Sequence, residues 1–399
     1  MTLPAWARIA LGMFAVCYGA NLFAPLLPVM RETHGLGQAP VNFILAVYVL
    51  GLIPALMVGG PLSDRRGRRS VVRPALLFSA VGTVVTLAAH LGVDAAWGPV
   101  LLCIGRMLTG IAVGLVLAAG ASWLKEVTAV TEGSDGSDGS GGAAARRATA
   151  ATSAGFGVGP LVSGPVAEWL PGPDTTPLII HLVMILLLTP LVWGTPEAGR
   201  RTASRLQFPP SARTPRFLFT VALWAPWAFG LATTSFAVLP PLVASGVSAP
   251  VAYTGLIAGV AMLTGTFVQP WAGRLPMGAR ITPPLYALAT AVIGMGAAII
   301  VVTTHAVWFL VPTAMILGTA YGIMMVSGLR EVQRIAAPGE LGSLTAVFYA
   351  LTYLGFFMPF VIALVAPLIG YVTVFIVGAA VCVVSILSVA VASRHSQPF

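Results

Sequence analysis

Twelve apolar stretches of about 20 residues, separated by polar or Pro- and Gly-containing breaks, constrain this chain more than any other feature of its sequence. An α-helix rises about 1.5 Å per residue, so a stretch of this length crosses the ~30 Å hydrocarbon core of a bilayer. The first stretch has no small-residue cleavage site after a short apolar core, so we expect it to be retained as a span. The sequence predicts membrane-spanning helices at residues 6–29, 41–62, 72–92, 98–122, 147–169, 177–194, 217–243, 251–273, 282–304, 306–328, 341–364 and 367–392.

Composition excludes a water-soluble fold. Only 8% of the 399 residues are charged and 57% are hydrophobic, whereas roughly 25% are charged in an ordinary soluble domain. A soluble chain of this length needs many more polar side chains to cover its surface, but a chain solvated by lipid can present apolar side chains outward. We therefore predict an all-α polytopic membrane protein, with the lipid bilayer as its surroundings.

The net charge of +9 is distributed in a way that indicates membrane orientation. If both termini are cytoplasmic, 19 of the 21 Lys and Arg residues lie on the cytoplasmic side, Arg31 lies outside and Arg106 lies within a span. Cytoplasmic loops of membrane proteins carry such an excess of positive charge. The basic residues form no stripe with interleaved aromatic residues, so no nucleic-acid partner is expected.

The chain reads as two similar halves. A connector rich in arginine and proline predicts a first bundle at 1–194, a cytoplasmic linker at 195–216 and a second bundle at 217–399. Gly110 and Gly114 of the fourth predicted span have counterparts in Gly318 and Gly322 of the tenth. Duplicated six-helix halves are typical of transporters that bind their substrate between the halves. A polar, low-complexity stretch at 131–142 is expected to be a disordered cytoplasmic loop.

A distinctive string, GPLSDRRGRR at residues 60–69, follows the second predicted span. It resembles the loop signature G-x-L-[AS]-D-R-x-G-R-[RK] of the major facilitator superfamily. Gly67 permits a tight turn, and Asp64 can accept hydrogen bonds from arginines and is favoured near a helix N-terminus. The alternative is a positively charged loop that only sets topology. We expect a conformational latch formed by Gly60, Asp64, Arg65, Gly67, Arg68, Arg69 and Glu126. The matching loop of the second half, residues 273–280, has no acidic residue, so any latch there is expected to be weak.

Arg106 is the one basic residue placed at hydrocarbon depth, which costs about 2.5–3.5 kcal/mol on insertion scales. It begins a string that resembles the family's R-x-x-x-G motif, where the arginine is associated with proton coupling or substrate handling. We assign that role to Arg106 with Asn21 and Tyr18 of the first span; the alternative is a structural arginine bonded to helix carbonyls. Many proton-coupled exporters of the family have a carboxylate in the first span, where this chain has Asn21. The remaining titratable candidates are Asp64, Glu126, Glu331, Glu32, Glu168 and His181.

The fifth predicted span contains a glycine- and proline-rich string that is similar to the antiporter signature of drug exporters in the same superfamily. Glycines on one face permit close helix contacts, and a proline removes a backbone hydrogen bond so that the helix can bend. The alternative is a helix that only packs. The residues that carry this resemblance are Gly155, Gly159, Pro160 and Gly164.

Aromatic and polar residues of the later spans are candidates to line a cavity for an amphipathic solute, because aromatic walls bury apolar surface and a few polar groups supply hydrogen bonds. They are Trp224, Trp227, Phe236, Gln269, Tyr321, Tyr349 and Tyr353.

Together these features resemble the twelve-helix drug:proton antiporter branch of the major facilitator superfamily. The resemblance implies a monomeric exporter of a small organic solute in a bacterial cytoplasmic membrane, with protons as the coupling ion; an uncoupled facilitator, an importer or a sensor on the same fold are the alternatives. An enzyme is not expected, because the five histidines are scattered along the sequence. The single cysteines, Cys17, Cys103 and Cys382, predict inert thiols, and no cofactor or metal is expected.

Overall fold

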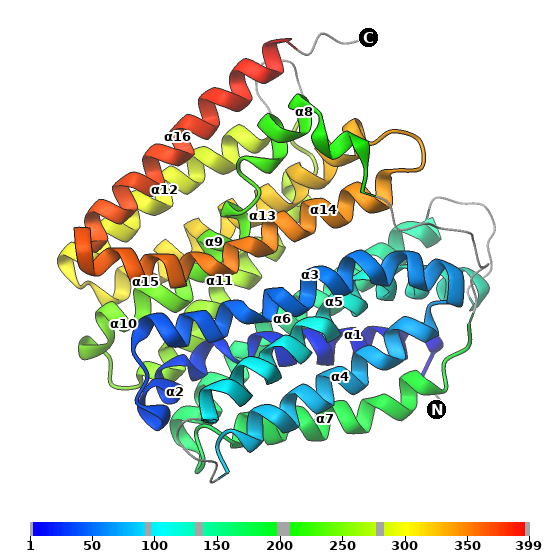
Figure 1. Cartoon of the computed structure of the whole chain (residues 1–399), viewed down its shortest axis with the longest axis horizontal. Helices are drawn as coiled ribbons and strands as arrows, with labels where there is room; N and C mark the ends of the chain where they lie inside the picture. The colour runs from blue at the N-terminus through cyan, green and yellow to red at the C-terminus, as the bar shows by residue number, and fades with distance from the viewer. Residues whose placement is uncertain (1–2, 92–96, 132–138, 198–207, 277–282, 396–399) are drawn as a thin grey trace. The chain divides into compact units, whose positions relative to one another are not determined.

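The computed structural model describes residues 3–91, 97–131, 139–197, 208–276 and 283–395, and every regular element in these ranges is a helix (Figure 1). The first half contains α1 Ala5–Asn21, α2 Leu27–His34, α3 Gln38–Arg66, α4 Arg69–Ala88, α5 Gly98–Thr131, α6 Gly139–Trp169 and α7 Thr176–Trp193. The second half contains α8 Pro215–Phe217, α9 Trp227–Thr233, α10 Leu239–Val243, α11 Pro250–Ala272, α12 Pro283–Thr304, α13 Val307–Ile335, α14 Leu341–Tyr353, α15 Met358–Ile369 and α16 Tyr371–His395.

Prolines divide several predicted spans into consecutive helices. The first span is α1 and α2 joined by a short 3-10 turn, Ala24–Leu26, which contains Pro25. The seventh runs from α8 through π-helical turns at Leu218–Ala222 and Thr234–Val238 to α10. Proline cannot donate the backbone hydrogen bond that an uninterrupted α-helix requires, so the helical pattern changes near these positions. Each of these two spans is still helical along its length, but its pattern of backbone hydrogen bonds changes from one part to the next.

Eleven helical segments are long and apolar enough to cross a membrane in the described part of the chain. They coincide with eleven of the twelve predicted spans. The remaining prediction, the fifth span at 147–169, lies on α6, which forms as a helix but is not among the eleven. This helix is built largely from Ala, Gly, Ser and Thr, which pack closely but are less apolar than Leu or Ile. The predicted all-α membrane fold is confirmed.

The chain forms two compact units: residues 1–35 with 44–206, and residues 36–43 with 207–399. In unit 1, α1 packs against α5, α6 and α7, while α4 packs against α5 and α7. In unit 2, α13 packs against α9, α11 and α12, and α12 lies beside α16 (Figure 1). Each unit therefore has its own helix-packed core.

Glycines place helix backbones in direct contact at equivalent positions of the two units. In unit 1, a β-carbon on Gly110 of α5 would collide with the Tyr48 carbonyl of α3. In unit 2, a β-carbon on Gly318 of α13 would collide with the Ala261 carbonyl of α11. The repeat seen in the sequence is thus also a repeat of packing, since small residues let helices approach closely.

Several observed helices extend beyond the predicted spans, and the largest extensions at a C-terminal end are in α5 and α13. The helices α5 and α13 continue to Thr131 and Ile335, beyond the predicted ends at 122 and 328. Hydropathy marks the apolar run, but α5 continues because Trp123, Leu124 and Val127 still pack in the interior.

The expected disordered loop at 131–142 is also partly helical, because α6 begins at Gly139. The alanines at 143–145 favour helix and extend it toward the N-terminus. Residues 132–138 of that loop and 198–207 of the predicted linker lie outside the described residues.

Candidate functional site

The GPLSDRRGRR string forms the end of α3 and the beginning of α4. Gly67 connects the two helices with a backbone φ of 96°, a value that favours glycine. Its N–H donates to the carbonyl of Ser63 at 2.9 Å, which closes the last turn of α3. The chain therefore reverses direction over a short turn and brings Asp64 and Arg68 to the same side of it.

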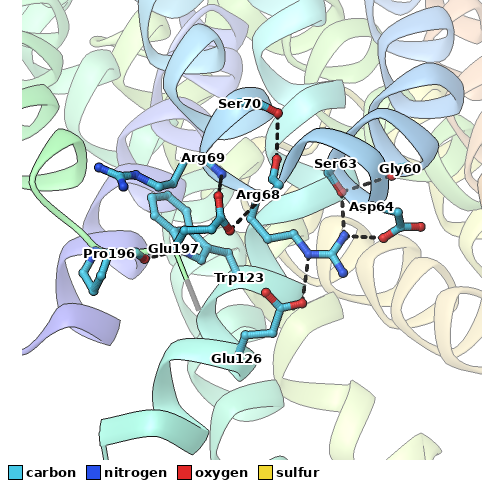
Figure 2. A network of polar contacts seen from close by, with 11 residues as sticks. Gly60, Ser63, Asp64, Arg68, Arg69, Ser70, Trp123, Glu126, Pro196 and Glu197 are labelled. Atoms are coloured by element: carbon cyan, nitrogen blue, oxygen red, sulfur yellow. Dashed lines mark hydrogen bonds and ion pairs between the residues drawn. The ribbon is translucent and has the colours of Figure 1, made fainter. Parts of the chain in front are cut away.

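Arg68 is the centre of a polar cluster in unit 1 (Figure 2). Its Nη1 donates to Asp64 Oδ1 at 2.5 Å and to Ser63 Oγ at 2.6 Å. Its Nε donates to Glu126 Oε1 of α5 at 2.9 Å. The arginine therefore connects the α3–α4 turn to α5 through three side-chain oxygens.

The charges in this cluster keep Arg68 protonated. Burial alone lowers the pKa of an arginine, because the charged form loses water. The hydrogen bonds and negative charges of Asp64 and Glu126 outweigh that effect, so the pKa of Arg68 is raised above its ordinary value. Arg68 is a permanent cation, and its carboxylate partners are only partly covered, with 30% of the Asp64 side chain and 23% of the Glu126 side chain exposed.

Glu197, which sequence reasoning missed, completes the cluster. Its two carboxylate oxygens accept hydrogen bonds from the backbone N–H groups of Arg68 and Arg69, each at 3.0 Å. The first N–H groups of a helix have no partner within the helix, and a carboxylate there is also favoured by the helix dipole. We expected Asp64 near a helix N-terminus, but Asp64 lies in the last turn of α3 and Glu197 takes that position on α4.

The other latch candidates divide into different environments. A β-carbon added to Gly60 would lie more than 4 Å from every described heavy atom outside its own stretch of helix. Arg65 is exposed. The guanidinium of Arg69 points away from that of Arg68 and donates to the carbonyl of Trp193 at 3.4 Å (Figure 2). Asp64, Gly67, Arg68 and Glu126 therefore lie together, whereas the side chain of Arg69 belongs to a neighbouring surface.

Arg106 of α5 is 2% exposed inside unit 1. It donates to the carbonyls of Ala20 at 3.0 Å and Leu45 at 3.4 Å. Its guanidinium carbon lies 4.4 Å from the ring centre of Phe23 and 4.8 Å from that of Tyr48. Carbonyl oxygens and aromatic faces can both stabilise a cation, so this buried charge is held without a carboxylate among the described residues.

Asn21 and Tyr18, predicted to act with Arg106, are buried beside α6 and α7. Asn21 Nδ2 donates to the carbonyl of Phe156 at 2.8 Å. The ring of Tyr18 stacks on His181 with centroids 6.1 Å apart. His181 in turn bonds to Thr83 Oγ1 at 2.8 Å. These contacts join α1 to α4, α6 and α7.

The antiporter-like string forms the face of α6 that contacts α1. A β-carbon on Gly155 would lie 2.5 Å from the Phe14 carbonyl, and one on Gly159 would lie 2.7 Å from the Tyr18 carbonyl. Pro160 and Gly164 follow within the same helix, and Ser163 Oγ donates to the Leu22 carbonyl at 2.9 Å. The observed contacts of this string are those of close helix packing inside unit 1.

Most of the predicted cavity residues are buried within unit 2. Tyr321 and Tyr353 both contact Phe229, at 5.0 and 4.4 Å between ring centres, in an aromatic cluster that sequence reasoning did not identify. Trp224 packs edge-on against Phe348. Phe236 is buried, Trp227 is 9% exposed, and Gln269 and Tyr349 are partly exposed.

The second unit has a different ion-pair arrangement at the end of α13. Glu331, the repeat counterpart of Glu126, accepts hydrogen bonds from Arg216 Nε at 3.2 Å and Nη2 at 2.9 Å. Arg216 lies in α8, at the beginning of the first span of this unit, and not between the second and third spans as Arg68 does. Residues 277–280 of the corresponding loop lie outside the described residues. The two equivalent glutamates therefore bind arginines from different parts of their units: Glu126 binds Arg68, and Glu331 binds Arg216.

Two histidines that look scattered in the sequence lie together in unit 1. His34 Nε2 is 3.3 Å from His90 Nδ1, and the same His90 nitrogen is 3.5 Å from Asp174 Oδ2. The described residues contain no group of three or more His, Cys, Asp or Glu residues arranged to hold a metal ion. The three cysteines are free thiols.

Comparison with known proteins gives the family. Residues 9–358 match the Major Facilitator Superfamily. The inner membrane transport protein YnfM of Escherichia coli is 30% identical over 129 residues, 31% of this chain and 29% of that protein. The bacillibactin exporter of Bacillus subtilis is 31% identical over 93 residues, 23% of each chain. These matches span less than a third of either relative.

A crystal structure of a D-xylose-proton symporter has the same fold, with a TM-score of 0.74, 14% identity and coverage of 98% of this chain and 97% of that one. The match to the superfamily covers most of the chain, and the helical architecture agrees with it. The chain is therefore a member of the Major Facilitator Superfamily, whose proteins transport small solutes across membranes.

Proposed function

We propose that this protein exports a small amphipathic organic solute by alternating access, in exchange for protons, as in the drug:proton antiporter branch. Membership of the superfamily supports transport of a small solute. The partial match to a bacillibactin exporter supports outward transport. The antiporter-like string at Gly155–Gly164 is the sequence feature that favours exchange.

The Arg68 cluster is the observation that carries this proposal. Its ion pairs with Asp64 and Glu126 are partly exposed. Both carboxylates keep part of their surface in contact with water, which can replace Arg68 as their partner when the pairs break during a cycle. A latch needs this property, because a contact that greatly stabilised one state would leave the other unpopulated.

Proton coupling needs a group that takes up and releases a proton during the transport cycle. The first span has Asn21 where a carboxylate is expected, and Arg106 is held by carbonyls and aromatic rings. An uncoupled facilitator or an importer on the same fold is the second candidate, and the asparagine at position 21, which cannot titrate, favours it. We assign coupling or substrate handling to Arg106 with Asn21 and Tyr18.

Transport by reconstituted protein tests the proposal. Liposomes containing the full chain and an internal pH-sensitive dye are challenged with amphipathic solutes of positive, neutral and negative charge. Export by exchange predicts solute-dependent proton movement that Arg68→Ala abolishes. The matched control is Arg146→Ala, which removes an exposed arginine of α6. Solute movement without proton movement would establish the facilitator instead.

The proposed setting is a bacterial cytoplasmic membrane, with a monomeric protein and both termini in the cytoplasm. The distribution of Lys and Arg residues supports this orientation. Single cysteines placed at the exposed Arg65 and at the exposed Trp97 lie on opposite sides in this arrangement. Labelling of intact cells with a membrane-impermeant maleimide should modify only the second.

A further inference from the structure

An arginine-rich pocket lies beside the latch, on the surface of unit 1 where α4 begins and α7 ends. It has a volume of about 430 Å³ and is lined by Arg66, Arg69, Arg73, Pro74, Trp193 and Glu197. The guanidinium of Arg73 also lies over the ring of Trp193 at 5.0 Å. Three cations and one carboxylate therefore share an open pocket at the ends of two membrane-spanning helices.

Among the described residues that line this pocket, three arginines and one carboxylate leave a net positive charge of two. The single carboxylate, Glu197, uses its two oxygens on backbone N–H groups of Arg68 and Arg69. Arg69 and Arg73 both donate to one oxygen, the carbonyl of Trp193. An arginine has five N–H donors. Arg69 and Arg73 each use only one of theirs on the Trp193 carbonyl.

Two of those donors are buried without partners. The Nε atoms of Arg69 and Arg73 are covered by protein, and neither has a hydrogen-bond acceptor among the described residues. A buried donor that lacks an acceptor is unfavourable, and more so on a charged group. Because these Nε atoms are covered, a ligand in the pocket would be held by the Nη groups of its arginines. An anion with several oxygens suits these groups, since arginine forks match phosphate geometry.

The surface next to the pocket indicates the source of the phosphate. Large apolar side chains on α4 and α7 are exposed, including Leu77 and Val81 of α4 and Val183 and Leu187 of α7. The two helices pack against each other. Trp193, 40% exposed at the end of α7, is of the residue type enriched at the membrane–water boundary. A ligand with a phosphate group and long acyl chains fits both the pocket and this surface, whereas free phosphate uses the pocket alone.

We infer that this pocket binds the phosphate headgroup of an anionic phospholipid, with Arg66, Arg69 and Arg73 as its cationic wall. Basic pockets between membrane helices are suited to such headgroups. Glu197 lines the pocket and also accepts hydrogen bonds from the backbone of Arg68 and Arg69. A lipid bound in the pocket would therefore stabilise the beginning of α4, the helix that directly follows Arg68. The lipid is thereby a structural partner of the α3–α4 turn.

Native mass spectrometry of the purified full chain tests this inference. The protein is titrated with phosphatidylglycerol or with phosphatidylcholine of the same acyl chains, and separately with phosphatidylglycerol in the presence of inorganic phosphate. We expect phosphatidylglycerol to bind more tightly than phosphatidylcholine, and its affinity to fall about fivefold for each of Arg66→Gln and Arg73→Gln. Millimolar inorganic phosphate should compete weakly.

Matched variants separate binding from folding. Arg147 also lies over a tryptophan, with its guanidinium carbon 4.1 Å from the ring centre of Trp6. Arg147→Gln removes the same charge from this similar environment and should leave lipid affinity unchanged. Arg73→Lys keeps the charge and should retain most of the affinity, which guards against a folding defect in Arg73→Gln. Equal binding of both lipids, or equal loss in Arg147→Gln, overturns the inference. Full competition by inorganic phosphate overturns the lipid assignment and makes this a site for free phosphate.

Discussion

The carboxylate of Glu197 occupies the space that a side chain on Gly67 would need: a β-carbon at position 67 would lie 2.5 Å from Oε2 of Glu197. The two residues come from distant parts of the chain, and Gly67 also has a φ of 96°. The backbone conformation favours glycine at position 67, and a β-carbon there would also displace the carboxylate of Glu197 from the N–H groups of Arg68 and Arg69.

The first prediction follows directly from this relationship. Gly67→Ala should destabilise the protein by about 1–3 kcal/mol, because a residue with a β-carbon is strained at this φ and must displace Glu197 from the N-terminus of α4. Thermal unfolding of the purified protein in detergent measures the change. The same variant should also slow solute transport.

Gly60→Ala is the matched control for that prediction. A β-carbon at position 60 would lie more than 4 Å from the rest of the described chain outside its own helix backbone, and the residue lies within α3. Alanine is favoured over glycine inside a helix by about 0.5–1 kcal/mol, so stability should be equal or slightly higher. If both variants lost the same stability, the special requirement at position 67 would be refuted.

Glu197→Gln should weaken the N-terminus of α4. Glutamine keeps one carbonyl oxygen, but its amide nitrogen faces a backbone N–H and cannot accept from it, and the charge that favours the helix dipole is lost. The expected loss of stability is about 0.5–2 kcal/mol, as for removal of a helix cap. Glu32→Gln, at an exposed glutamate of α2, is the control and should leave the melting temperature unchanged. Identical behaviour of the two variants would contradict the capping role.

Asp64 and Glu126 should be energetically coupled, because both bind the guanidinium of Arg68. In a double-mutant cycle with Asp64→Asn and Glu126→Gln, the effects on stability should deviate from additivity by at least about 0.5 kcal/mol. The control cycle pairs Asp64→Asn with Glu331→Gln, which has no hydrogen-bond partner in common with it. That cycle should be additive within about 0.5 kcal/mol. Additivity in both cycles would show that Arg68 does not link the two carboxylates.

Arg106→Lys should destabilise unit 1 despite keeping the charge. A lysine nitrogen cannot reach the carbonyls of Ala20 and Leu45 while also covering two aromatic rings, so a buried cation loses part of its solvation. We expect a loss of about 1.5–3 kcal/mol, measured by thermal unfolding.

Transport by the folded Arg106→Lys fraction separates structure from coupling. The proposed coupling role predicts that this fraction moves solute with less accompanying proton movement. If solute and proton movement per folded molecule both equal those of the unsubstituted protein, Arg106 acts only by holding helices together.

His90 should make the protein less stable in acid. Burial is the main reason that the pKa of His90 lies below its ordinary value; Asp174 opposes the shift and His34 adds to it. As the pH falls below about 6.5, the unfolded chain takes up a proton that folded His90 does not, so stability decreases with falling pH. Melting temperatures between about pH 7.5 and pH 5 should decline less steeply in His90→Gln. His305→Gln, which removes an exposed ring, should keep the original slope.

Local sequence features determined the fold class, the positions of the membrane-spanning helices and the α3–α4 turn. A run of apolar residues, a glycine at a turn, or an aspartate four residues before an arginine acts over a few residues, so each can be identified without knowing the rest of the chain. The string at residues 60–69 therefore predicted that Asp64 accepts a hydrogen bond from an arginine, and the structure shows that this arginine is Arg68. The glycine pairs of α5 and α13 likewise indicated close helix packing from their spacing alone.

Only the tertiary structure decided which distant groups complete these sites. Glu197 lies 129 residues from Arg68 along the chain and has no motif of its own. The carbonyls that hold Arg106 belong to Ala20 and Leu45, and every residue has a carbonyl, so no residue type marks them in the sequence. The contact between His34 and His90 depends in the same way on how α2 and the end of α4 pack. Hydropathy places each helix in the membrane, but the packing of side chains selects its neighbours, and that selection created the Arg68 cluster and the arginine-rich pocket beside it.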